Sequence, residues 1–385
     1  MTSRRRRRRA KRTVRLTHLA AFAAGVLFVW VAVSVRAWIH PERASPARLD
    51  PLTTPPSRFH WTEQPAPAFP IPPYARYLED VRIVLDPGHG GDADRPNWKR
   101  GPTGLREADV NLRVAQFLRE FLDAAGARAW LTRDADVALD ADPAADLAKR
   151  IGLANELNAD LFLSIHHNGA DQPGPNYTSL YFHGSPEQSA ASRCAARYLL
   201  TGLTDALRLE QDLPCAVLSD HVLYQNGLHV LRAARVPAVL GEASFHSNPQ
   251  EEQRLRDLLY NRCEAYGYFV GLARWAQAGL PRIELLEPER TATRAARRWV
   301  VELDDGLSAR GGFGSQTLKI AADSLVVKLN GQRVPFTADL AKHRLAIDLP
   351  ARLSGGSAEL FVDFENVFGQ HVLHPRVVVS RSGGP

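Results

Sequence analysis

Residues 81–91 read VRIVLDPGHGG, and this stretch decides the fold class. Its first six residues form a short apolar run bounded by Pro87 and Gly88, which is the pattern of a strand buried on both faces. The glycines let the backbone turn sharply, so that His89 projects at the carboxyl end of the strand. Such strands belong to parallel sheets that are covered by helices and bind ligands at this edge.

The sequence then alternates between helix and strand patterns. Apolar residues at helical spacing run from Val110 to Leu122, and Gly126 stands just beyond them as a C-cap candidate. This order predicts an α/β domain over residues 81–278, with a mostly parallel sheet and helices on both faces. Further strands are predicted over 128–132, 160–166, 178–183, 228–232 and 236–242, and further helices over 146–158, 187–206 and about 249–276.

Histidine and glutamate residues stand where the predicted strands end. His89 follows the first strand, His166 ends a later one, and Glu242 ends the run AVLGE. Glu107 lies at the start of the helix that carries Val110. Because the carboxyl ends of parallel strands meet at one edge, these side chains are expected to converge. Two imidazoles and a carboxylate make an open zinc site that leaves the fourth position for water.

Each of these residues has a simpler interpretation when taken alone. A histidine at a turn is usually solvated or hydrogen-bonded, and the helix macrodipole favours a glutamate such as Glu107 in a first turn. An apolar strand carries Glu242 to a buried edge where an unpaired carboxylate is costly, so its alternative is a buried ion pair with an arginine. The joint pattern at matched strand ends favours a metal centre.

At this point the sequence resembles a known family. It is similar to the zinc-dependent N-acetylmuramoyl-L-alanine amidases, the AmiC-like cell-wall hydrolases often called amidase type 3. The resemblance covers about residues 81–276 in the family's order. The matching segments are IVLDPGHGG (83–91), GLREADVNL (104–112), LTRDAD (131–136), RIGLANELNADLFLSIHHN (150–168) and VPAVLGEASFHSN (236–248).

The resemblance implies that His89, Glu107 and His166 bind zinc and that Glu242 is the catalytic carboxylate. It also implies that the substrate is peptidoglycan and that the bond cleaved is the amide between N-acetylmuramic acid and L-alanine. His166, rather than His167, aligns with the family's metal-binding histidine. Strand alternation supports this choice, because consecutive side chains point to opposite faces and only one of the two can face the metal.

Three further residues are candidate substrate contacts: Asn168, His246 and Asn248. Ser244 replaces the glycine that the family usually has, and His246 is unusual at its position, where a surface or loop location is expected. The segment between His166 and Glu242 shows no extra helix of the kind that covers the active site in some relatives, which disfavours autoinhibition. Three histidines match no motif and are assigned structural roles: His183, His221 and His229.

The sequence changes character after Pro281. Residues 290–381 hold short β-rich runs separated by Gly, Asn, Asp and Pro, which predicts an all-β sandwich. The segments LNGQRVPF and DFENVFGQH resemble those of bacterial immunoglobulin-like modules. A wall-binding module, a module for a protein partner or activator, and a spacer are all compatible with this region.

The N-terminus predicts export. Residues 1–15 are a basic tail, and residues 16–35 contain no Asp, Glu, Lys or Arg over a length that spans a bilayer. Because positive charge stays on the cytoplasmic side, we expect a single-pass signal anchor in the cytoplasmic membrane with the catalytic domain in the periplasm or cell wall. A cleaved signal peptide, and hence secretion, is the alternative. Residues 36–80 are a proline-rich linker.

The distribution of charge disfavours a nucleic-acid-binding function. The formal charge is +6, but residues 1–35 hold nine basic and no acidic residues, so the remainder carries −3. The basicity therefore belongs to the tail, and a nucleic-acid partner is not expected.

The sequence has three cysteines: Cys194, Cys215 and Cys263. No two of them form a C-x-x-C pair, which disfavours a thiolate zinc site. One disulfide with three possible pairings is compatible with export, and a buried apolar role is the default for each thiol.

Two other functions remain compatible with these motifs. One is a peptidoglycan-binding protein on a degenerate amidase fold, although all four functional positions are present here. The other is an exported metallohydrolase that acts on a different peptide amide.

Overall fold

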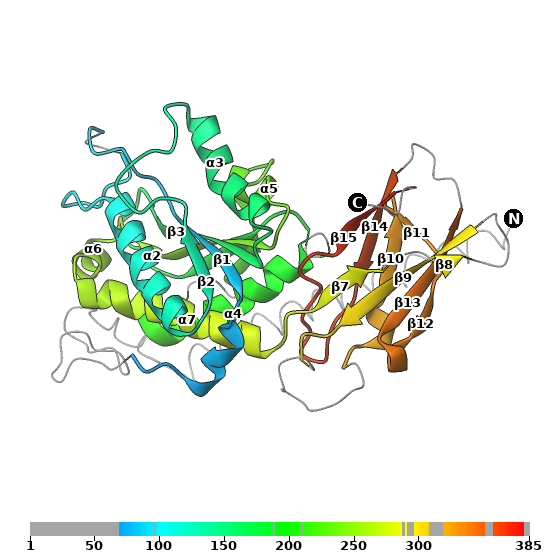
Figure 1. Cartoon of the computed structure of the whole chain (residues 1–385). Coiled ribbons are helices and arrows are strands. Elements are labelled where there is room, and N and C mark those ends of the chain that lie inside the picture. Colours follow the sequence, from blue (N-terminus) through cyan, green and yellow to red (C-terminus); the bar gives the residue numbers. More distant parts are fainter. Residues whose placement is uncertain are drawn as a thin grey trace, which may run out of the picture. The chain divides into compact units, whose positions relative to one another are not determined.

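The computed structural model describes residues 69–380 apart from short gaps at 96–97, 186, 188, 210, 212, 214, 287–288, 291–295, 308–318 and 351–356 (Figure 1). The predicted tail and anchor, and the linker up to residue 68, lie outside the described residues. Within the described part, no helix combines the length and apolarity needed to cross a bilayer.

A six-stranded sheet forms the centre of the α/β region, in the order β2-β1-β3-β6-β4-β5. The first four strands in this order are parallel, whereas β4 runs antiparallel to β6 and β5 runs parallel to β4. The sheet is therefore mostly parallel, as predicted. Its strands are β1 (Arg82–Pro87), β2 (Arg128–Leu131), β3 (Leu161–Asn168), β4 (Ser179–Phe182), β5 (Val217–Ser219) and β6 (Ala238–Phe245).

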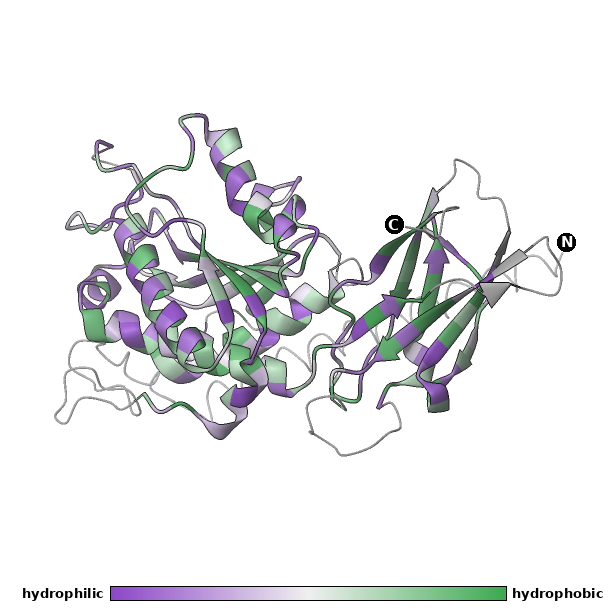
Figure 2. Cartoon of the chain, in the orientation of Figure 1, coloured by the Kyte–Doolittle hydropathy of each residue, from purple (hydrophilic) through white to green (hydrophobic). Residues whose placement is uncertain are grey.

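Helices cover both faces of this sheet, which confirms the predicted layers. One apolar core joins the sheet to α2 (Glu107–Ala124), α4 (Ala190–Leu207) and α7 (Leu258–Gln277). A second core on the opposite face joins it to α3 (Pro143–Glu156) and α5 (His229–Arg232). Figure 2 shows hydrophobic residues along the central strands, where alternate side chains enter the two cores.

Two predicted elements are wrong. Residues 228–232 were expected as a strand, but residues His229–Arg232 form the short helix α5. A short apolar run does not distinguish a strand from a helix by periodicity, and the edge position of the sheet is taken by β5 instead. The single helix predicted over 249–276 is two helices, α6 (Pro249–Leu255) and α7, because Asp257 starts a new helix by accepting a hydrogen bond from the Leu259 N–H.

The segment that precedes β1 packs against the helical face. The 3₁₀ helix η1 (Pro73–Leu78) buries Ala75 and Leu78, and the Phe69 ring contacts the Tyr266 ring edge-on. The Tyr266 hydroxyl also donates to the carbonyl of Pro70 at 2.8 Å. Residues 69–80, which the sequence places in the linker, therefore belong to the packed structure.

Residues 282–380 form two antiparallel sheets that share one hydrophobic core. One sheet has the order β11-β10-β14-β15, and the other has the order β12-β13-β9-β7 with β8 paired to β9. The strands are β7 (Arg282–Leu285), β8 (Glu289–Arg290), β9 (Ala296–Asp304), β10 (Val326–Leu329), β11 (Gln332–Arg333), β12 (Thr337–Asp339), β13 (Arg344–Pro350), β14 (Ser357–Asp363) and β15 (Arg376–Ser380).

All three cysteines are free thiols. Cys194 and Cys263 are buried, as expected, and burial raises the pKa of Cys263 to about 12. Cys215 is exposed, so the expectation of a buried role is wrong for that residue.

Candidate metal centre

His89 is held in place by the turn that follows β1. Its backbone has a φ of +59°, an uncommon conformation for a residue with a side chain. Arg133 donates from Nε to the carbonyl of Pro87 and from Nη2 to that of Gly88, both at 2.8 Å. Arg150 donates from Nη2 to the carbonyl of His89 at 2.8 Å. The two buried guanidinium groups therefore stabilise the strained turn that aims His89.

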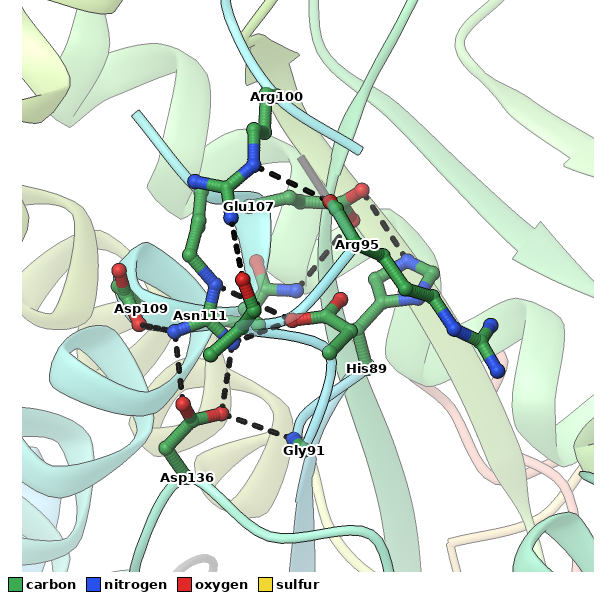
Figure 3. A network of polar contacts seen from close by, with 12 residues as sticks. His89, Gly91, Arg95, Arg100, Glu107, Asp109, Asn111 and Asp136 are labelled. Atoms are coloured by element: carbon green, nitrogen blue, oxygen red, sulfur yellow. Dashed lines mark hydrogen bonds and ion pairs between the residues drawn. The ribbon is translucent and has the colours of Figure 1, made fainter. Parts of the chain in front are cut away.

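Glu107 is the first residue of α2 and lies between two imidazoles. Its Oε2 atom is 3.1 Å from His89 Nε2, and its Oε1 atom is 3.0 Å from His166 Nδ1. Figure 3 shows the His89 and Glu107 side chains pointing toward one another. One ligand atom from each of the three residues lies within 4.8 Å of the other two. The structure thus brings the three predicted metal ligands together.

Gly88 provides the space that His166 occupies. A Cβ atom at position 88 would lie 2.1 Å from Cε1 of the His166 ring. Any side chain here would displace that ring, so the DPGHGG turn requires glycine at this position for steric reasons.

The charges of the three residues suit a cation. Burial raises the pKa of Glu107, but the neighbouring His89 and His166 outweigh burial and hold that pKa well below its usual value. Burial lowers the pKa of His166, which favours the neutral imidazole. An ionised carboxylate beside a neutral imidazole is the protonation state that metal binding requires.

Glu242 lies on β6 in register with His166 on β3, so the two side chains project to the same face of the sheet. Its Oε2 atom is buried without a hydrogen-bond partner, and no ion pair reaches it from the described residues. Burial, followed by repulsion from Glu107, raises the pKa of Glu242 well above its usual value. The structure therefore does not show the ion pair with an arginine considered as the alternative.

His167 points to the other side of β3, as strand alternation predicts. Its Nε2 atom lies 2.9 Å from Glu264 Oε2 and its Nδ1 atom lies 2.8 Å from Asn111 Oδ1, with both ends of the His167–Glu264 pair fully buried. Asn111 in turn donates from Nδ2 to Glu107 Oε1 at 3.3 Å. This chain of contacts connects α7 to the carboxylate of Glu107 and restricts its orientation.

The three candidate substrate contacts occupy different surroundings. Asn248 caps α6 by accepting from the Gln250 and Glu251 N–H groups, and Asn168 Oδ1 accepts from the Gly169 N–H. Each of these two side chains therefore holds its local backbone, and its contact with substrate stays a prediction.

His246 is buried, and its expected surface location is wrong. Its Nε2 atom is 3.7 Å from Glu107 Oε2, and its Nδ1 atom is buried without a hydrogen-bond partner. Burial lowers the pKa of His246 to about 4, so the ring is neutral near pH 7. His246 directly follows β6, and this position places its side chain beside Glu107.

Several residues that hold the site together were not identified from the sequence. Arg133 and Arg150 lie in the segments LTRDAD and RIGLAN, but their bonds to the turn carbonyls depend on tertiary contacts. Arg106 pairs with Asp92, Asp109 and Asp136, and Asp136 also accepts from the Gly91 N–H at 2.9 Å (Figure 3). The sequence offers one signal for these arginines: they are charged residues within the segments that resemble the family.

Comparison with known proteins shows similarity to cell-wall amidases. The profile of the family described as N-acetylmuramoyl-L-alanine amidase matches residues 83–274. The chain is 27% identical to the probable cell wall amidase LytH of Staphylococcus epidermidis over 51% of this chain and 59% of LytH. It is 26% identical to the amidase AmiC of Escherichia coli over 56% of this chain and 57% of AmiC. The chain thus spans little more than half the length of these curated relatives.

A solved structure is also similar to part of this chain. The catalytic domain of CwlV, an N-acetylmuramoyl-L-alanine amidase from Bacillus (Paenibacillus) polymyxa var. colistinus, is 27% identical and matches 51% of this chain and 97% of that domain, with a TM-score of 0.43.

Proposed function

We propose, from the premise that residues 83–274 belong to the N-acetylmuramoyl-L-alanine amidase family, that this protein is a zinc-dependent peptidoglycan amidase. The bond it hydrolyses is the amide between N-acetylmuramic acid and the L-alanine of the stem peptide. The observation that carries the proposal is the His89–Glu107–His166 group with the unpaired carboxylate of Glu242 on the neighbouring strand.

The residues present fit a zinc ion. Two imidazoles and one carboxylate are a usual donor set for catalytic zinc, and their ligand atoms already converge within 4.8 Å. When bound, zinc lowers the pKa of water and polarises a carbonyl group. Asn111, Arg133 and Arg150 hold the ligands in place through Glu107 and the turn at His89, so little reorganisation is needed.

Glu242 supplies the acid–base chemistry of the reaction. Its carboxylate accepts a proton from the attacking water as the water oxygen bonds to the carbonyl carbon. It then delivers that proton to the leaving nitrogen as the C–N bond breaks. The raised pKa of Glu242 suits a group that must hold a proton between the two steps, and a zinc ion held by the neighbouring ligands would lower that pKa and favour the ionised base.

The remaining parts of the chain fit a cell-wall location. We place the catalytic domain outside the cytoplasmic membrane, anchored by residues 16–35 through the proline-rich segment, with secretion as the outcome if the anchor is cleaved. The two sheets of residues 282–380 are assigned to an immunoglobulin-like module that contacts the wall or a partner protein.

Mass spectrometry of muropeptides released from purified sacculi tests the proposal. We expect free stem peptides to appear with the wild-type protein and to disappear with Glu242→Gln, while zinc remains bound. Glu284→Gln, which alters an exposed carboxylate of β7, is the matched control. Near-wild-type activity of Glu242→Gln would exclude the assigned role, and products that lack free stem peptides would indicate a different amide substrate.

Zinc content separates the enzyme from a degenerate binding protein. A protein that only binds the wall has no requirement for metal, so sacculus binding that persists without zinc and without any released peptide would favour that alternative.

A further inference from the structure

A second group of two histidines and a carboxylate lies at the other edge of the sheet. His183 directly follows β4, and Asp220 and His221 directly follow β5. These strands are parallel to each other, and Phe182 pairs with Ser219, so their carboxyl ends lie side by side. Because β4 runs antiparallel to β6, these ends point away from the edge that holds Glu107.

Asp220 is fully buried and its orientation is set by the backbone. Its Oδ2 atom accepts from the Leu228 N–H at 2.8 Å, and its Oδ1 atom accepts from the Gly184 N–H at 3.3 Å. Gly227 approaches so closely that a Cβ atom there would lie 2.4 Å from Oδ2. Among the described residues no lysine or arginine forms an ion pair with Asp220, so a buried carboxylate lacks a permanent positive partner.

Two histidines lie next to this carboxylate. His183 Nδ1 is 3.0 Å from Asp220 Oδ2, and the His221 ring meets the His183 ring edge-on with centroids 5.3 Å apart. One ligand atom from each of the three residues lies within 4.8 Å of the others. Imidazole and carboxylate are ligands that zinc and similar divalent transition metals accept.

We propose that His183, Asp220 and His221 bind a second divalent transition-metal ion. The ion lies between His183 Nδ1 and Asp220 Oδ2, whose direct contact it replaces, and its charge compensates that of the buried carboxylate. His221 is exposed, so the remaining coordination positions face solvent and are filled by water. The ion joins the ends of β4 and β5 to the loop of residues 220–228, which gives the site a structural role separate from amide hydrolysis.

Metal stoichiometry of the full chain tests this site directly. The protein carries no histidine tag, is freed of metal with a chelator, and is titrated with Zn²⁺ by calorimetry and with Co²⁺ by visible absorption. We expect two equivalents for the wild type, one for His221→Ala, one for His89→Ala and none for the double variant. His229→Ala removes a nearby histidine that is outside the group and is the matched control.

The outcomes distinguish this site from the catalytic centre. Identical stoichiometry for His221→Ala and His229→Ala overturns the second site, whatever the result for His89→Ala. Loss of one equivalent in His221→Ala with no change in His89→Ala supports the second site and contradicts the proposed catalytic zinc. His221 is exposed, and we expect its removal to leave the fold intact, which circular dichroism verifies.

Discussion

Two groups with the same donor set stand at opposite edges of one sheet and differ in what surrounds them. Glu107 joins His89 and His166 in a buried position beside the unpaired Glu242, whereas Asp220 joins His183 and the exposed His221. The ligand types alone therefore do not distinguish the two groups. A buried location and a free base beside the ligands make the first group suitable for hydrolysis.

Removal of one histidine from each group should give the largest contrast. We expect His166→Ala to reduce turnover of purified peptidoglycan by more than about 1,000-fold, because a bound metal lowers the pKa of water from ~15.7 to about 7. His221→Ala should stay within about twofold of wild type, since its group lies at the other edge. Comparable losses in the two variants would show that the groups are functionally coupled.

The buried pair behind the first group should contribute strongly to stability. Glu264→Ala leaves His167 buried without its charged partner, and we expect the free energy of unfolding to fall by about 3–5 kcal/mol. Asp205→Ala, which removes a partly exposed partner of Arg274, is the control and should cost less than about 1 kcal/mol. Urea denaturation measures both, and equal losses would show that burial of the first pair is unimportant.

Glycine substitutions probe the space beside each group. Gly88→Ala places a methyl group against the His166 ring, so we expect activity to fall together with zinc content. Gly227→Ala places one against Asp220 at a φ of +63°, and we expect a loss of about 1–3 kcal/mol in stability without loss of activity.

Gly152→Ala is the control for both substitutions, because a Cβ atom at this helical position meets nothing within 4 Å. We expect it to increase the free energy of unfolding by about 0.5–1 kcal/mol. Unchanged activity in Gly88→Ala would contradict the steric role assigned to that glycine.

The carboxylate of Glu242, beside the first group, should lower the stability of the metal-free protein. The pKa of Glu242 is raised above the unfolded value of 4.5, so the folded chain binds more protons and wild-type stability falls as pH increases above that value. Glu242→Gln lacks this penalty, so we expect the variant to be more stable than the wild type at pH 8 and this difference to vanish below about pH 4. Urea denaturation in chelator at the two pH values measures it; a loss of stability at pH 8 would contradict the shift.

Short-range patterns predicted much of the fold and the convergence of His89, Glu107, His166 and Glu242, whose roles stay predictions. The run VRIVLD, its glycine turn and the strand ends at His166 and Glu242 predicted where the chemistry gathers, because parallel strands deliver their carboxyl ends to one edge. The same reasoning failed for residues 228–232, where a short apolar run fits a helix or a strand equally well.

What the sequence by itself determined was the alternation of helices and strands, and the identity and spacing of His89, Glu107, His166 and Glu242 within recognisable motifs. Only the tertiary structure decided which distant residues meet: Arg133 and Arg150 at the turn, Glu264 beneath His167, and His246 beside Glu107. It also brought His183 to Asp220 and His221, which no motif joins. The physical reason is that periodicity reports which face a side chain takes, whereas contact between two side chains depends on how separate elements pack.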